Sequence, residues 1–176
     1  MRRLAWVGRT DRLAIAACAV SLLAAGLGAV ALPPGHAGDV REIRGLMMYL
    51  CVPQSHYGPG DPVAVYVTLV NAGTRTLAVP ANLRFVAAWT VAGKEEVFPQ
   101  DDPERVSGPA PDARGALQMA PGDRAVFRLT LRPPRRALIH GVYPLRVTCD
   151  LTRTLGGTLA SETSAVKIQY KVMVVF

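Results

Sequence analysis

Three side chains between positions 47 and 56 offer metal-binding atoms. They are Met47, Cys51 and His56, and thioether, thiolate and imidazole groups are the ligands that Cu(I) prefers. Met47 and its neighbour Met48 would point to opposite faces of a strand, and methionine commonly fills gaps in a core. No HxxH or CxxC spacing occurs in the chain. Envelope copper handling is therefore an alternative hypothesis, and the sequence predicts no cofactor.

A second charged group lies in a proline-rich stretch, residues 99–123, where apolar periodicity is lost until residue 117. Long stretches of this kind are often functional loops. Carboxylates could gather there around Ca²⁺, but the DxDxDG spacing is absent and Pro103 interrupts the run. We expect a solvated loop that contacts a partner through Asp101, Asp102, Glu104, Arg105 and Asp112.

Catalytic motifs are missing from the chain. It contains no GxSxG, no HExxH and no glycine-rich phosphate loop. His56 and His140 are the only near-neutral bases after residue 37, and the adjacency of Ser55 and His56 does not create a nucleophile–base pair. The sequence therefore predicts a protein that is not an enzyme.

The N-terminal part has the pattern of an export segment. Residues 1–12 hold four arginines, residues 13–32 carry no charge, and Pro33-Pro34-Gly35 follows. This order is typical of a secretory signal, with small-residue cleavage sites after Ala31 and Ala37. Twenty apolar residues are also long enough for an uncleaved anchor helix. Either reading makes residues 1–37 a signal peptide or membrane anchor and places residues 38–176 in the periplasm, outside the cell or at the outer face of the cytoplasmic membrane.

Export has a consequence for the cysteines. Cys18 lies in the apolar segment, which leaves Cys51 and Cys149 in an oxidising compartment. Alternation places Cys51 on the face of Met47 and Tyr49, and Cys149 on the face of Leu145 and Val147. We take both faces to be directed toward the core and predict a Cys51–Cys149 disulfide. Two free buried thiols, or a metal or intermolecular role, are the alternatives.

Residues 40–175 alternate with period two, the pattern of half-buried strands. Turn signals recur about every 8–12 residues and helical periodicity is nearly absent, so we expect about seven strands in a two-sheet sandwich. A small closed barrel is the alternative. The predicted strand regions are 40–52, 63–70, 76–79, 83–91, 95–98, 124–131, 142–151 and 164–175.

Three turn-and-strand motifs carry a family resemblance over residues 45–175. They are YGPGDPV followed by VTLVNAG, APGDR followed by FRLTL, and GVYPLRV, with Trp89 on the third main strand. Their order resembles bacterial immunoglobulin-like domains of the BsuPI proteinase-inhibitor and CARDB types. The resemblance implies an immunoglobulin-like fold for residues 38–176. It also raises protease inhibition as an alternative function, although no reactive-loop motif is matched.

Charge limits the choice of partner. The chain carries 20 Lys and Arg against 13 Asp and Glu, a net charge of +7. Without residues 1–37 the balance is 16 against 12, or +4, and no basic stripe with interleaved aromatic residues occurs. We expect no nucleic acid partner, and contact with a membrane only through residues 13–32. The favoured function is an extracytoplasmic binding or scaffolding module that meets another envelope or secreted protein by a sheet face, an edge strand or the 99–123 loop.

Overall fold

The computed structural model describes residues 42–54, 56–100, 103–134 and 140–169. By its contacts the chain divides into two compact units, residues 1–35 and 36–176, and all described residues belong to the second. No helix in these ranges is long and apolar enough to span a membrane. The predicted export segment, including the apolar run at 13–32, lies outside the described residues.

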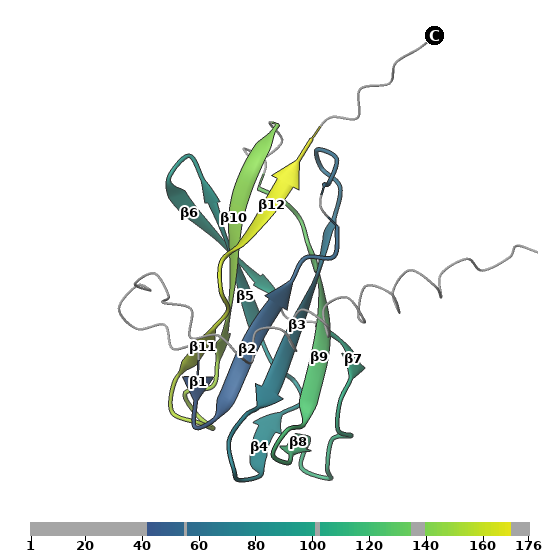
Figure 1. Cartoon of the computed structure of the whole chain (residues 1–176), viewed down its shortest axis with the longest axis vertical. Helices are drawn as coiled ribbons and strands as arrows, with labels where there is room; N and C mark the ends of the chain where they lie inside the picture. Colours follow the sequence, from purple (N-terminus) through teal and green to yellow (C-terminus); the bar gives the residue numbers. More distant parts are fainter. Residues whose placement is uncertain (1–41, 55, 101–102, 135–139, 170–176) are drawn as a thin grey trace, which may run out of the picture. The chain divides into compact units, whose positions relative to one another are not determined.

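The described residues are all β, as predicted. One sheet, which we call the β3 sheet, has the strand order β1-β2-β3-β9-β7. In Figure 1 the strands β2, β3 and β9 run side by side through it. Its strands are β1 (Glu42–Ile43), β2 (Leu46–Cys51), β3 (Val63–Asn71), β7 (Glu104–Ser107) and β9 (Arg124–Leu131).

The opposing sheet, the β10 sheet, has the order β11-β10-β5-β6, and β12 also pairs with β10. Its strands are β5 (Phe85–Val91), β6 (Lys94–Gln100), β10 (Gly141–Asp150), β11 (Thr158–Ala160) and β12 (Ser164–Ile168). A third, two-stranded sheet joins β4 (Leu77–Pro80) to β8 (Ala116–Met119). All the strand pairs within these sheets are antiparallel.

The core lies between the β3 sheet and the β10 sheet. Alternate residues of the central strands are fully buried, which is the arrangement that period-two sequences favour. The rings of Phe85 on β5 and Phe127 on β9 meet across the two sheets, with centroids 5.5 Å apart and planes at 55°. Trp89 is also fully buried, as expected for a core residue. These contacts confirm the predicted β-sandwich.

Several strand boundaries differ from the prediction. The region 40–52 is broken by a turn in which Arg44 has a φ of 53° and Gly45 a φ of 89°. The stretch 99–123 is not one loop, because it contains the end of β6 and all of β7 and β8. The strand predicted for 164–175 is described only as far as Ile168, and residues 170–176 lie outside the described part.

Candidate functional site

The outward face of the β10 sheet carries the first candidate surface. Strand register places Arg146, Ala88 and Val97 in one row across β10, β5 and β6. Val97 is 55% exposed and Val142, on the same face of β10, is 56% exposed. No other large apolar side chain in the described ranges is classed as exposed. We call this surface the outer patch, and its members are Val86, Ala88, Glu95, Val97, Pro99, Val142, Pro144 and Arg146.

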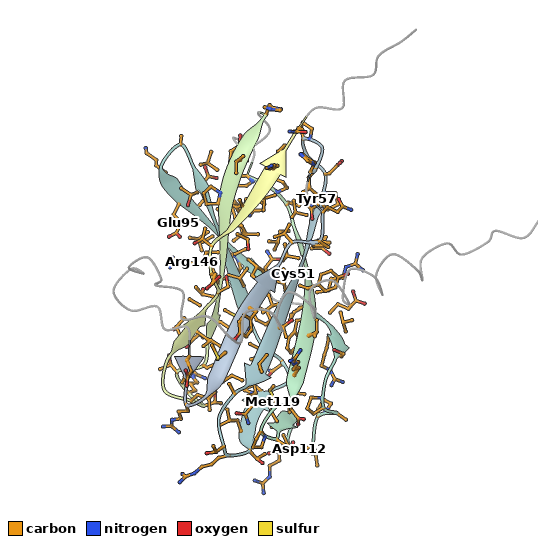
Figure 2. The ribbon with its side chains drawn as sticks, in the orientation of Figure 1. Cys51, Tyr57, Glu95, Asp112, Met119 and Arg146 are labelled. Atoms are coloured by element: carbon orange, nitrogen blue, oxygen red, sulfur yellow. The ribbon has the colours of Figure 1, made fainter. Side chains whose placement is uncertain are left out.

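An ion pair crosses the outer patch. Nη2 of Arg146 on β10 donates to Oε1 of Glu95 on β6 over 2.9 Å. Since β5 lies between these two strands, the pair passes over β5 on its outward side, and Figure 2 shows both side chains at that side of the sandwich. An ion pair on an exposed face contributes at most about 1 kcal/mol to stability. Its larger effect is to place a fixed positive and a fixed negative group among apolar side chains.

The inward-facing side of β6 opens onto the second candidate surface. A groove of about 740 Å³ lies between β6 and the end of β9. We call it the edge groove, and it is lined by Glu96, Phe98, Pro99, Gln100, Thr130, Arg132, Pro133 and Pro134. Four of these eight residues are apolar and rigid (one phenylalanine and three prolines), and the charged groups are one carboxylate and one guanidinium. A volume of this size matches that of ordinary ligand and peptide pockets.

The edge groove lies beyond the part of β9 that pairs with β7. β7 pairs with β9 only at Arg128, Phe127 and Val126, and its register shifts between Arg105 and Ser107. β9 continues to Leu131 and remains paired with β3 on its other side. No described strand lies beside residues 129–131 of β9 on the side where β7 ends. The two proline residues that follow cannot donate backbone hydrogen bonds and end the strand.

The residues predicted for a partner-binding loop are divided between β7, the turn before β8 and a part of the chain outside the described residues. Glu104 and Arg105 lie on β7, where Glu104 is 3.6 Å from the guanidinium of Arg128 and Arg105 donates to the carbonyl of Pro109. Asp101 and Asp102 lie outside the described residues. The expectation of one continuous loop from 99 to 123 is wrong, because short strands with few apolar residues escape a test based on periodicity.

Asp112 has a structural role. Its Oδ1 accepts hydrogen bonds from the backbone N–H groups of Arg114 and Ala116 at 2.8 and 2.9 Å, and its Oδ2 accepts one from Gln118 at 2.7 Å. These bonds, that of Ala116 foremost, lower the pKa of the Asp112 carboxyl below its usual value. The side chain stabilises the turn before β8, a role typical of aspartate in turns.

The predicted Cys51–Cys149 disulfide is wrong, since Cys149 is a free thiol that is fully buried. Cys149 points into the core from β10, and burial raises its pKa to about 12. On β2 the inward residues are Leu46 and Met48, so Cys51 shares the opposite, outward face with Met47 and Tyr49. Both faces of β2 carry apolar residues, so alternation alone predicts the wrong face as the one directed toward the core.

The candidate metal ligands are not gathered either. Met47 and Cys51 are four residues apart on β2, a separation of about 13 Å along a strand. Ligands on one ion lie about 2–2.3 Å from it, so the two side chains would have to lean toward each other past Tyr49, which lies between them on the same face. The hydroxyl of Tyr49 donates to the sulfur of Met47 at 3.4 Å. His56 lies beyond the end of β2, and within the described ranges no three His, Cys, Asp or Glu residues form a metal-binding group.

Sequence reasoning missed the outer patch and the edge groove. The sequence pattern does not distinguish Val97 and Val142 from core residues, because alternation does not say which face of a strand is covered. The groove depends on how β6 lies beside the end of β9, and no local sequence signal records that arrangement. Only the two consecutive prolines at 133 and 134 mark the end of β9 in the sequence.

Comparison with known proteins yields fold neighbours only. No family model and no curated protein matches the chain. It is similar to the CARDB domain of the PF1109 protein from Pyrococcus furiosus, with 14% identity and a TM-score of 0.42 over 76% of this chain and 100% of that one. It is also similar to Spo0M, a sporulation control protein from Bacillus subtilis, with 13% identity and a TM-score of 0.42 over 72% and 50%.

A third neighbour is AvmM, which catalyses macrocyclization in alchivemycin A biosynthesis. It has 11% identity and a TM-score of 0.47 over 79% of this chain and 100% of AvmM. The resemblance to CARDB-type modules in the sequence thus recurs among the solved structures. At these values it concerns the type of fold and says nothing about activity.

Proposed function

We propose that residues 38–176 form an extracytoplasmic, non-catalytic module that binds another protein through the outer patch. The observation that carries the proposal is the position of Val97 and Val142. These side chains are more than half exposed, lie on one sheet face and flank a fixed ion pair. An apolar surface with a few fixed charges is the composition that protein-binding surfaces favour.

The edge strands of the described sheets are poorly suited to pairing with a strand of another protein. This favours binding through a sheet face. β1 and β11 have two and three residues, and β7 has four with an irregular register. β6 is longer, but Pro99 lies within it and lacks a backbone N–H. Short strands, irregular register and proline all reduce edge-to-edge pairing.

The titratable groups in the described residues support a non-catalytic role. The thiol of Cys149 has a pKa of about 12, so almost none of it is the nucleophilic thiolate at neutral pH. Hydrogen bonds lower the pKa values of Asp112, mainly from the backbone of Ala116, and of Asp150, mainly from the side chain of Thr152 and then its backbone. General acids need carboxyl pKa values raised toward neutrality, which is the opposite direction.

The binding proposal can be tested by capture from envelope extracts with paired variants. The double variant Val97→Asp and Val142→Asp places two charges on the outer patch without touching the core. We expect it to lose a protein that the unaltered chain captures. The matched control is Thr130→Asp, which adds a charge in the edge groove and should retain that protein. Capture that is equal for all three chains would exclude the outer patch as the contact.

The extracytoplasmic placement has its own test. It rests on residues 1–32, so we expect alkaline phosphatase fused after residue 176 to be active in intact cells. A matched fusion with residues 13–32 deleted should be inactive. If a reporter that works only in the cytosol is active at the same fusion point and alkaline phosphatase is not, export is contradicted. The binding proposal would then still be tested by the capture experiment.

A further inference from the structure

A pocket separate from the edge groove lies where the turn between β1 and β2 meets the loop between β3 and β4, at the end of the sandwich that holds β1 and β4 in Figure 1. It has a volume of about 580 Å³ and is lined by residues 42, 44 and 45 on one side and 73–77 on the other. This volume is in the range of small-molecule sites. We call it the arginine pocket, after Arg44 and Arg75 in its lining.

The two walls of the arginine pocket are held together by close backbone contact. The N–H of Ala72 donates to the carbonyl of Gly45 over 2.7 Å. A Cβ atom added to Gly45 would stand 2.6 Å from Cα of Gly73, which is closer than a side chain allows. Oδ1 of the buried Asn71 accepts the N–H of Gly73, and its amide donates to the carbonyl of Arg75 over 2.8 Å. The backbone of the pocket is therefore fixed before a ligand binds, which lowers the cost of binding.

The side chains of the arginine pocket carry positive charge without a partner. Arg44 and Arg75 are exposed, and neither makes a hydrogen bond or an ion pair through its side chain within the described ranges. Thr74 and Thr76 are exposed beside them and add two hydroxyl groups. Glu42 is the one carboxylate in the lining, so two positive charges and one negative charge leave a net charge of +1. Guanidinium groups bind carboxylates and phosphates through parallel N–H groups.

The conformation of the β1–β2 turn does not require an arginine. Arg44 has a φ of 53°, in the left-handed region that glycine adopts more readily. Its Nη2 lies 4.0 Å from the position that a Cβ atom of Gly156 would take, and it forms no hydrogen bond there. The guanidinium group of Arg44 can therefore turn toward an anion without breaking a hydrogen bond or an ion pair.

We propose that the arginine pocket binds the oxyanion group of an acidic small molecule, a phosphate or a carboxylate, between the guanidinium groups of Arg44 and Arg75. The pocket has the volume of a small-molecule site, so the oxyanion is one group of a larger ligand. The carboxylate of Glu42 repels the oxyanion and accepts a hydrogen bond from a hydroxyl or amino group of the same ligand. None of these residues belongs to the outer patch, so this proposal and the binding proposal can fail separately.

The test treats the full chain in detergent with phenylglyoxal, which modifies exposed guanidinium groups, and measures the rate at each arginine by mass spectrometry. Inorganic phosphate and succinate are each compared with sodium chloride of equal ionic strength. With a Kd on the order of 1 mM, about 10 mM of the bound anion should slow the modification of Arg44 and Arg75 about tenfold. The anion that protects them identifies the acidic group of the ligand as phosphate or carboxylate.

Arg114 is the control within the same molecule. It is exposed in the turn before β8 and does not line the pocket. Its modification should have the same rate in all three salts. Equal slowing at Arg114, or equal rates at Arg44 and Arg75 in all three salts, would overturn the proposal.

Variants separate binding from folding. Arg44→Gly should abolish the protection of Arg75 and leave the Tm equal or higher, because glycine adopts the left-handed turn without strain. Arg75→Gln should abolish the protection of Arg44. Glu42→Gln should have the opposite effect, with protection at several-fold lower anion concentration, because a repelling charge is removed. Protection of either arginine that persists after loss of the other would refute a shared site. Capture of a protein by the outer patch should be the same for all three variants.

Discussion

Two regions of the sandwich use similar polar residues for different purposes. At the end where β3 meets the loop before β4, Asn71 and the acidic residues of nearby turns bond the backbone; Figure 2 shows Asp112 and Met119 there and Tyr57 at the opposite end. Beside β6, Glu95 pairs with another side chain and Glu96 lines a groove. We call the first region the turn end and the second the β6 side.

The difference shows how to separate structural from recognition residues in this protein. Asp112, Asp123 and Asp150 each accept backbone N–H groups within their own turn, at 2.8–2.9 Å. Their carboxylates are already used and stabilise loops. The carboxylates of the β6 side make no such local turn contacts among the hydrogen bonds of the described residues. In this protein a charged residue is therefore a candidate for binding when it pairs with a distant side chain or lines a groove. A charged residue that bonds the backbone of its own turn is structural.

The largest expected contrast concerns thiol reactivity. Cys149 is fully buried near the turn end, and its pKa is about 12. At pH 8 we expect iodoacetamide to modify it at least a thousand-fold more slowly than a cysteine introduced on the β6 side by Val97→Cys, since a thiol with the usual pKa of about 8.5 is partly ionised. Peptide-level mass spectrometry separates the two sites.

Unfolding supplies the control for this experiment. In denaturant without reductant, Cys149 should react fully, because it is a free thiol. A Cys149 that remains unmodified in the denatured, unreduced chain would be disulfide-bonded and would restore the bridge expected from the sequence.

The next effect is on stability at the turn end. Asn71 is fully buried, and its side-chain amide donates to the carbonyls of Arg75 and Met119, both at 2.8 Å. Its Oδ1 also accepts the N–H of Gly73 at 3.0 Å. Replacing it with alanine removes three hydrogen bonds, one of them to a buried carbonyl, so Asn71→Ala should lower the free energy of unfolding by about 3 kcal/mol. Urea denaturation measures this loss.

Gln100→Ala is the matched change on the β6 side. The Gln100 amide donates to the carbonyl of its neighbour Pro99 at an exposed position. Its removal should change the free energy of unfolding by less than about 0.5 kcal/mol. Equal losses for the two amide-to-alanine changes would erase the distinction between the regions.

A smaller effect should follow acidification. The pKa of Asp112 is lowered in the folded state, so its ionised form stabilises the fold. That contribution is present above the unfolded pKa of about 4 and is lost as the pH falls through the lower folded value. Asp112→Asn should therefore lower the Tm at pH 7, and the difference from the unaltered chain should shrink toward pH 3. A difference that stays constant over this range would show that the charge of Asp112 does not contribute.

The sequence predicted the fold better than it predicted the site. Alternation located the strands that cross the core, and the expected boundaries 124–131 match β9 residue for residue. It did not decide which face of β2 is buried, because Met47, Tyr49 and Cys51 are as apolar as Leu46, Met48 and Leu50. It also missed β7 and β8, whose four residues each give too short a pattern to recognise.

The candidate site could not be read from the sequence for a related reason. Exposure of Val97 depends on the outward face of β6 being uncovered, and the groove depends on how β6 lies beside the end of β9. Both are properties of how distant segments are arranged. The charges within residues 101–112 predicted a binding loop, yet Asp112 accepts three hydrogen bonds that stabilise its own turn.

The smallest effect tests whether the ion pair on the outer patch serves stability or recognition. Arg146 and Glu95 are 2.9 Å apart, with side chains 21% and 47% exposed. A double-mutant cycle of Glu95→Gln and Arg146→Gln should give a coupling energy in unfolding of at most about 1 kcal/mol, because solvent screens the pair. The same two variants should weaken partner capture by more than that, since a bound protein would exclude water from the pair. A large coupling energy in unfolding together with unchanged capture would show that the ion pair stabilises the fold, as the carboxylates of the turn end do, and does not bind the partner.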